Sequence, residues 1–185
     1  MARSVVILGG AKCVWEDLDN ARRFGTFDAT FAINDMLAHY PGEIDVFVSL
    51  HPEKAAEWLK QRDAKGFPRP KKRIAHENNT QQGRPNAFRI DETLEYRWPG
   101  MSGSGSSGLF AVKVAIGEGF DRIVLCGVPM TPEPHFFDGK PWSECSSFTK
   151  AWTEALRFYA DKTRSMSGWT RDLLGEPTKD WLARP

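Results

Sequence analysis

Short apolar runs rich in β-branched residues recur along the chain and alternate with segments of helical periodicity. The runs are apolar at successive positions rather than at every second one, which is typical of strands buried on both faces of a parallel sheet. We expect strands at Ser4–Leu8, Asp28–Ile33, Asp45–Leu50, Arg73–His76, Arg122–Cys126 and Thr163–Met166.

The intervening segments predict helices at Glu16–Arg23, Pro52–Arg62, Ser106–Glu118, Phe148–Ala160 and Trp169–Leu174. Ser106–Glu118 carries apolar residues on most of its faces, so we expect this helix to be largely buried. Ser146 or Ser147 is the residue expected to cap the helix that follows.

Strands that alternate with helices predict an α/β fold, a Rossmann-like, doubly wound and mostly parallel sheet with helices on both faces. At ~100–200 residues per domain, a chain of 185 residues predicts one domain over 1–185. Two segments interrupt the alternation, at 66–108 and 129–146, and we interpret them as long loops over the binding edge of the sheet. Ordered surface excursions without a ligand are the alternative interpretation.

Composition excludes several classes of protein. The 25 Lys and Arg residues against 24 Asp and Glu residues leave a net charge of +1, which indicates no polyanionic partner. No apolar run approaches the ~18 residues of a membrane span, and the run after Met1 is too short for a signal peptide. Three widely separated cysteines argue against a disulfide framework, so we expect a cytoplasmic protein.

In a doubly wound sheet, ligands bind where the strands end at their carboxyl edge. Gly9, Gly10 and Lys12 follow the first strand, and glycines there would let the backbone approach a phosphate that Lys12 could pair with. A tight turn without a ligand is the alternative, because the full G-x-G-x-x-G fingerprint is absent.

The strongest site signal is the Gly/Ser segment that leads into the buried helix. Its hydroxyls and the free N–H groups of the helix N-terminus suit a phosphate or carboxylate. A flexible linker is the alternative, although the abrupt change to an apolar helix argues against it. The candidate residues are Ser104, Ser106, Ser107 and Gly108.

Other candidates follow the remaining strands. Asn34 and Asp35 can read the hydrogen-bonding edge of a base or sugar, or can cap a helix. Gly127 follows the fifth strand, and Ser165 and Ser167 follow the last as a candidate anion nest or a capped turn.

Two histidines are candidates for chemistry because imidazole titrates near neutral pH. His135, in the loop after the fifth strand, is the candidate catalytic base. His51, at the end of the third strand, is a candidate ligand contact. A lone histidine can equally be structural, and His39 and His76 carry no functional argument.

We expect no metal site, because the cysteines show no paired spacing. Asp17 and Asp19 form an Asp-x-Asp pair inside a predicted helix, which we interpret as a solvated face. The basic run Lys60–Arg73 could contact nucleic acid, but we favour a solvated helix end and loop. No pattern decides the oligomeric state or whether Trp98, Trp142 and Trp169 lie in the core or at a ligand.

Four segments together resemble the nucleotide-binding half of bacterial sialyltransferases and the related pterin pyrophosphokinase-like domains. They are Val5–Leu18, Asp28–Asp35, Asp45–Leu50 and Ser106–Met130. In that superfamily a first strand ends in a Gly-rich loop, a second ends in an Asn, and a Ser-Gly pair opens a buried helix. The resemblance implies a cytidine-nucleotide sugar as donor, no metal-holding Asp-x-Asp, and a histidine that deprotonates an acceptor hydroxyl; here that histidine is His135.

Three functions follow from these observations. The leading hypothesis is a small nucleotide-sugar-dependent glycosyltransferase with a CMP-linked donor and no membrane partner. A Mg²⁺-dependent nucleotide phosphotransferase or diphosphotransferase would use the same phosphate-binding residues. A non-enzymatic module that binds a nucleotide or nucleic acid is the third.

Overall fold

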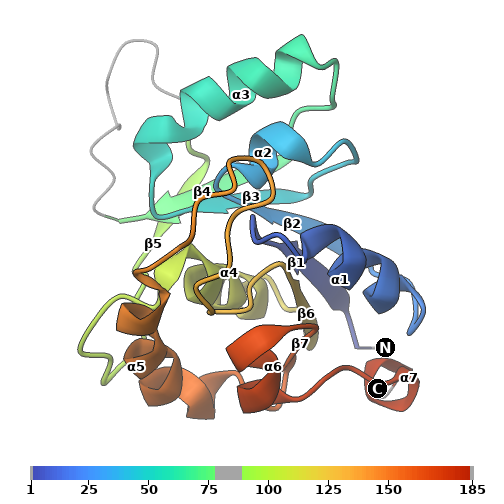
Figure 1. Cartoon of the computed structure of the whole chain (residues 1–185), viewed down its shortest axis with the longest axis vertical. Helices are drawn as coiled ribbons and strands as arrows, with labels where there is room; N and C mark the ends of the chain where they lie inside the picture. The colour runs from blue at the N-terminus through green and yellow to red at the C-terminus, as the bar shows by residue number, and fades with distance from the viewer. Residues whose placement is uncertain (1, 78–88, 184–185) are drawn as a thin grey trace.

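The fold is built on one parallel sheet, seen in a computed structural model that describes residues 2–77 and 89–183. Residues 78–88, which belong to the predicted loop at 66–108, lie outside this description. The seven strands stand in the order β5-β4-β3-β2-β1-β6-β7, and every neighbouring pair is parallel (Figure 1). The strands are β1 Ser4–Leu8, β2 Ala29–Ile33, β3 Val46–Ser49, β4 Lys72–His76, β5 Glu92–Leu94, β6 Arg122–Cys126 and β7 Thr163–Ser165.

Successive residues of each strand point to opposite faces of the sheet, and both faces are buried. In β1, Val5 and Ile7 belong to one hydrophobic core, whereas Val6 and Leu8 belong to the other. This explains why the strands are apolar at successive positions and confirms the predicted α/β, Rossmann-like sheet.

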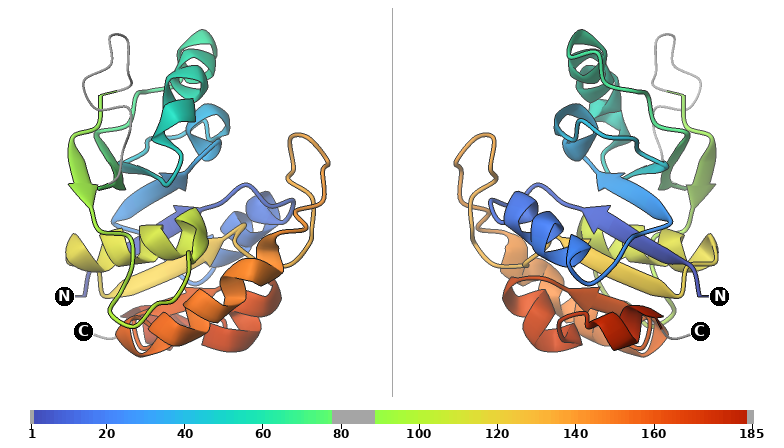
Figure 2. Two further views of the ribbon diagram at one scale, coloured as in Figure 1. Left: turned by 90° about the vertical axis from the view of Figure 1, so that its left-hand side faces the viewer. Right: turned by 90° about the vertical axis from the view of Figure 1, so that its right-hand side faces the viewer.

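Helices cover both faces of the sheet (Figure 2). The first face packs against α4 Ser106–Gly117, α5 Cys145–Ala155 and the end of α6 Gly168–Leu174. The second face packs against α1 Val14–Arg22, α2 Met36–His39, α3 Ala55–Ala64 and α7 Lys179–Ala183. Two short 3-10 turns, η1 Pro52–Lys54 and η2 Leu156–Phe158, precede α3 and follow α5. Among the described residues, no helix has the length and apolar character needed to cross a membrane.

The sequence patterns missed three short elements and misplaced one helix. α2, β5 and α7 were not expected, because four, three and five residues are too few to show a period. α5 begins at Cys145, so Ser146 and Ser147 lie inside the helix and neither is its N-cap. Instead, the Ser147 hydroxyl donates to the Glu144 carbonyl at 2.7 Å.

Candidate functional site

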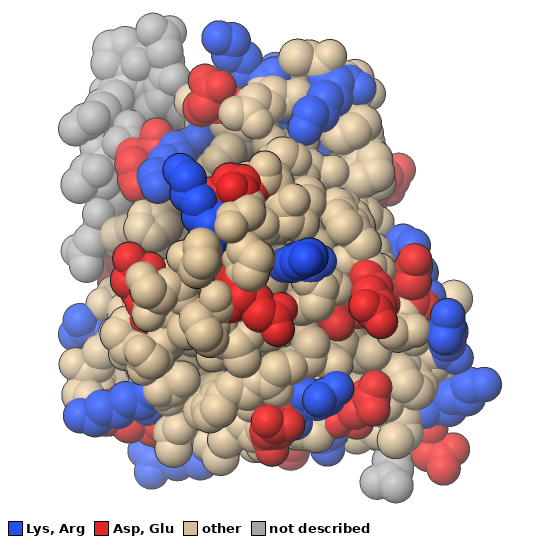
Figure 3. All heavy atoms as spheres, viewed as in Figure 1, with Lys and Arg blue, Asp and Glu red and all other residues tan. Residues whose placement is uncertain are grey.

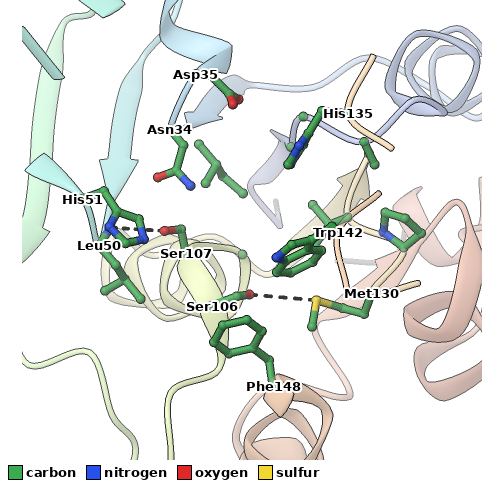
Figure 4. A pocket seen from close by; sticks show the side chains of 18 of the residues that line it. Asn34, Asp35, Leu50, His51, Ser106, Ser107, Met130, His135, Trp142 and Phe148 are labelled. Atoms are coloured by element: carbon green, nitrogen blue, oxygen red, sulfur yellow. Dashed lines mark hydrogen bonds between the residues drawn. The ribbon is translucent and has the colours of Figure 1, made fainter. Parts of the chain in front are cut away.

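A cavity of about 580 Å³ opens at the carboxyl edge of the sheet. It lies where the strand order reverses, since the chain proceeds from β1 outward through β2 to β5 and then returns to β6 on the other side. This topological switch point is where doubly wound folds bind ligands. Eleven of the fourteen predicted site residues line it: Gly9, Gly10, Asn34, Asp35, His51, Ser104, Ser106, Ser107, Gly108, Gly127 and His135 (Figure 4).

Two glycine turns meet at the switch point and leave no space for side chains. A Cβ on Gly9 would lie 2.4 Å from the Gly127 carbonyl oxygen, and a Cβ on Gly127 would lie 2.5 Å from the Gly9 oxygen. Gly127 also has φ +68°, which favours glycine. The turns are joined by a hydrogen bond from the Ala11 N–H to the Gly127 carbonyl, so the loops after β1 and β6 form one floor of the cavity.

Asp17 supports this floor from behind, contrary to the solvated face that the sequence predicted. Its carboxylate is 6% exposed and accepts hydrogen bonds from the Gly127 N–H at 2.8 Å and the Ser167 hydroxyl at 2.7 Å. The first turn of α1 therefore braces the β6 turn and the loop after β7. The sequence showed only an acidic pair in a helix and not which carboxylate faces the core.

Asn34 is presented to the cavity by a strained backbone and a fixed side chain. Its φ of +52° lies in the left-handed region, which Asn tolerates better than most residues. Its Oδ1 accepts a 2.7 Å hydrogen bond from the buried Ser49 hydroxyl. The amide nitrogen is thereby directed into the cavity, as Figure 4 shows, and is available to donate to a ligand.

The N-terminus of α4 forms the opposite wall. Ser106 has φ +71°, and no side chain caps the helix. The Ser107 hydroxyl accepts a hydrogen bond from the Leu50 N–H at 3.2 Å and so ties α4 to the end of β3. Gly108 packs closely, because a Cβ there would lie 2.8 Å from Val128 Cγ1. The Ser106 N–H donates to the Ser104 hydroxyl at 3.4 Å, whereas the N–H groups of Ser107 and Gly108 have no acceptor among the described residues and are open to an anion.

His135 is held in the cavity by backbone pairing between its loop and the loop after β1. Residues Ala11 and His135 form an antiparallel bridge. The Lys12 N–H donates to the Pro134 carbonyl at 3.0 Å, and the Phe136 N–H donates to the Gly10 carbonyl at 3.2 Å. This loop, drawn in orange between β6 and α5, thus crosses the carboxyl edge (Figure 1).

The His135 ring has both an aromatic and an acidic neighbour. It stacks on Phe137 at 5.2 Å between ring centroids, and its Nδ1 lies 3.8 Å from Asp138 Oδ1. His39, which carried no functional argument, stacks on the same Phe137 at 4.9 Å. His39 is therefore part of the support of the loop, and burial lowers its pKa.

Asp35 lies across the cavity floor from His135. A Cβ on Gly10 would lie 2.8 Å from Asp35 Oδ1 and 3.3 Å from His135 Cδ2, so both side chains converge over Gly10. Burial, followed by the nearby charge of Asp138, raises the pKa of Asp35 from 3.8 to about 7. The carboxyl group is therefore partly protonated at neutral pH.

His51 lies at the rim of the cavity. Its side chain is 54% exposed, and its Nδ1 lies 3.2 Å from Glu53 Oε1. The third cavity histidine, His76, ends β4 and has a buried Nδ1 without a hydrogen-bond partner among the described residues.

Several aromatic and apolar side chains of the cavity wall were not predicted as site residues. Trp142 and Phe148 stack at 5.6 Å between centroids and face Met130 and Ser106 (Figure 4). The remaining large apolar wall residues are Trp58, Tyr96 and Leu50. Of the three tryptophans left open by the sequence, Trp142 lies at the cavity, Trp98 is buried in the core, and Trp169 packs partly buried against it. Local sequence shows an aromatic residue in a loop but not which way it faces.

Three predicted phosphate contacts do not line the cavity. Lys12 lies beyond the Gly9–Gly10 turn and contributes its backbone N–H to the loop pairing. The Ser165 hydroxyl is fully buried beside the Thr170 hydroxyl at 2.8 Å, and Ser167 bonds to Asp17. The hydroxyls of Ser165 and Ser167 are therefore engaged in hydrogen bonds within the protein.

Most basic side chains between Lys60 and Arg73 have hydrogen-bond or ion-pair partners within the fold. Arg62 is fully buried and donates to the carbonyls of Leu37, Tyr40 and Gly42. The ion pairs of the run are Arg69–Asp63, Lys71–Glu43, Lys71–Asp45, Lys72–Glu92, Lys72–Glu118 and Arg73–Asp91. Acidic and basic side chains are interspersed over the face shown in Figure 3.

Metal ligands do not gather in the described part of the chain, where no group of three His, Cys, Asp or Glu side chains could hold an ion. The three cysteines are free. Burial raises the pKa of Cys13 to about 12, so its thiol is protonated at neutral pH.

The chain resembles proteins of known structure in its fold but matches no sequence family. No protein-family model and no curated protein matches the chain. The sialyltransferase CST-II in complex with a trisaccharide acceptor and CMP is similar with a TM-score of 0.65 at 16% identity, covering 95% of this chain and 86% of that one. A variant of CST-II with CMP has a TM-score of 0.67 at 15% identity, covering 96% and 88%. CstII from Campylobacter jejuni with the substrate analogue CMP-3FNeuAc has a TM-score of 0.57 at 14% identity, covering 97% and 86%.

These likenesses establish a sialyltransferase-like fold for the chain. The comparisons lend no support to the other part of the resemblance, that to pterin pyrophosphokinase-like domains.

Proposed function

We propose that the protein is a glycosyltransferase that moves a sugar from a CMP-linked donor to a hydroxyl acceptor. The observation that carries this proposal is the cavity at the switch point, which combines anion-binding N–H groups with a histidine in a fold shared with CMP-bound proteins.

Uncharged groups of the cavity would bind the donor. The N–H of Gly10 has no acceptor among the described residues, and neither do the N–H groups of Ser107 and Gly108 in the first turn of α4. These N–H groups, with the Ser104 and Ser106 hydroxyls, would hold the phosphate. The directed amide of Asn34 would bind the base or ribose.

The charge of the cavity favours a monophosphate over a diphosphate. Lys54 is the one Lys or Arg among the described residues that line it, and Asp35 and Glu133 line it as well. A nucleoside diphosphate carries more negative charge and would need more cations, from the protein or from a metal ion. A CMP-linked sugar, with a single phosphate, needs fewer cations.

In the proposed reaction, His135 accepts the proton of the acceptor hydroxyl as that oxygen bonds to the anomeric carbon. The bond from the anomeric carbon to the phosphate oxygen breaks, and CMP leaves with the bonding electrons. Asp138, near the second ring nitrogen, stabilises the imidazolium that forms. General base catalysis of this kind contributes typically ~10²–10⁴-fold in rate.

The first experiment is calorimetric titration of CMP, UMP, AMP, GMP, ATP and GTP, each with Mg²⁺ and with a chelator. We expect CMP to bind in both conditions, and Asn34→Ala to weaken it about tenfold through the loss of one polar contact. Asp172→Asn, at an exposed position on α6, is the control and is expected to bind like the wild type. Binding only of purine triphosphates with Mg²⁺ would instead support the phosphotransferase.

The second experiment separates binding from chemistry at His135. We expect His135→Gln to lower the rate of sugar transfer from CMP-linked donors by about 100-fold or more. Its affinity for CMP is expected to stay within about threefold of the wild type. Wild-type protein that binds CMP but neither hydrolyses nor transfers any CMP-linked sugar would indicate a binding module.

A further inference from the structure

Asp35 lies beside the groups that would hold the phosphate. It directly follows Asn34 at the end of β2 and lines the cavity. Its Oδ1 is so close to Gly10 that a Cβ there would lie 2.8 Å away. The same Gly10 offers its N–H without an acceptor among the described residues. A phosphate bound to this N–H would therefore lie close to the Asp35 carboxyl group.

The surroundings of Asp35 are poor in positive charge. The loop after β6 contributes Asp138, whose charge disfavours ionisation of Asp35. The backbone N–H groups of Asp35 and Met36 and, more weakly, Lys54 of η1 act in the opposite direction. His135 from the same loop shares the space over Gly10. Glu133 also lines the cavity. An ionised Asp35 would repel a phosphate here, whereas a neutral carboxyl group could donate a short hydrogen bond to it.

We propose that Asp35 binds the phosphate of the nucleotide as a neutral carboxylic acid, so that anion binding is coupled to the uptake of one proton. The proposal rests on the proposed function, because it takes the phosphate of CMP as the anion. On binding, an Asp35 oxygen takes up a proton from solvent, and that O–H donates to a phosphate oxygen.

The proton is available at neutral pH. Burial and Asp138 raise the pKa of Asp35 to about 7, so a bound anion needs to shift the protonation only slightly. Among the described residues that line the cavity, Lys54 is the one lysine, and protonation of Asp35 would help such a cavity to accept an anion. It removes one negative charge and adds a hydrogen-bond donor. Affinity for the phosphate is thus expected to decrease as the pH rises above 7.

The test compares CMP with cytidine, which lacks the phosphate, by calorimetric titration between pH 7 and 9. In this range the phosphate of free CMP is already a dianion, since the second pKa of a phosphate monoester is about 6. We expect the affinity for CMP to fall about tenfold per pH unit at the upper end and that for cytidine to stay constant. The heat of CMP binding should also vary with the ionisation enthalpy of the buffer, as proton uptake requires.

Two variants decide the origin of this slope. Asp35→Asn keeps the shape and a donor but does not titrate, so its affinity for CMP should be constant over the range and exceed that of the wild type at pH 9. Asp138→Asn removes the neighbouring charge but leaves Asp35. The affinity of this variant for CMP should therefore fall with the same slope, but the fall should begin at a lower pH. Cytidine binding reports that each variant is folded.

A slope retained in Asp35→Asn would overturn the inference and assign the proton to a histidine. Constant affinity of the wild type from pH 7 to 9, with CMP bound, would overturn it too while leaving the proposed function intact. Failure of CMP to bind at any pH would overturn the proposed function itself, and this proposal with it.

Discussion

At the scale of single residues, the site depends on positions where the fold forces an unusual state. Gly9 and Gly127 occupy backbone that has no room for a Cβ, and Asn34 accepts a left-handed backbone that directs its amide into the cavity. Asp35 carries a carboxyl group in a place that disfavours its charge. Such strained or poorly solvated groups cluster where proteins bind ligands.

The raised pKa of Asp35 predicts a pH-dependent cost to stability. Because its folded pKa of about 7 exceeds the unfolded value of 3.8, the folded state binds more protons between these values. The free energy of unfolding therefore falls as the pH rises from about 4 to about 7, and the full cost is present above 7. We expect Asp35→Asn to raise the free energy of unfolding by about 1–3 kcal/mol at pH 8 and by less at pH 5.5.

Urea unfolding at the two pH values measures this difference. Asp172→Asn is the control, because this carboxylate is exposed on α6 and should leave the stability nearly unchanged at both. An equal effect of Asp35→Asn at pH 5.5 and pH 8 would contradict the prediction.

At the scale of secondary structure, α2 is too short to be stable by itself and depends on α3. It has four residues, and isolated helices of this length do not persist in water. Arg62 of α3 donates to the carbonyls of Leu37 and Tyr40 at its C-terminal end and of Gly42 beyond it. This side chain closes the end of α2, which begins directly after Asp35, so it also supports one wall of the cavity.

We expect Arg62→Met to lower the free energy of unfolding by about 3 kcal/mol or more, because it leaves several buried carbonyls without donors. Arg69→Met is the matched control: its ion pair with Asp63 is exposed, and such pairs contribute about 0–1 kcal/mol. Denaturant unfolding of both variants measures the contrast, and similar losses would show that the buried network contributes little.

At the scale of the whole molecule, positive and negative charges are nearly equal in number and interspersed on the surface. The net charge is +1, and four basic residues of the run at Lys60–Arg73 pair with acids from several segments: Arg69, Lys71, Lys72 and Arg73. Sequence-independent binding to nucleic acid requires cations that are free to replace counterions. The arrangement favours a small-molecule ligand over a polyanion.

We therefore expect little binding of single- or double-stranded DNA or RNA at 150 mM salt, with a dissociation constant weaker than about 10⁻⁴ M. Lys71→Ala combined with Lys72→Ala should leave any residual binding at lower salt and its salt dependence unchanged. Fluorescence anisotropy across a salt series measures both. Tight binding that these substitutions abolish would restore the nucleic-acid hypothesis.

The sequence by itself determined the α/β class and the positions of six of the strands. β1, β6 and α4 were predicted within a residue of their bounds. This was possible because apolar runs and helical periodicity are patterns of residues that are close in sequence. The alternation of strands and helices then implies which segments end at the carboxyl edge. For this reason Gly9, Asn34, Ser107 and His135 could be assigned to one site before any contact was known.

Only the tertiary structure decided which side chains face that site. Asp17 braces the floor, Ser165 is buried, and Trp142 forms a wall, although all three lie in segments whose positions the sequence indicated. The short elements α2 and β5 also exist only through their neighbours, α3 and β4. The physical reason is that burial, hydrogen-bond partners and shifted pKa values arise from residues distant in sequence, and local patterns carry no information about them.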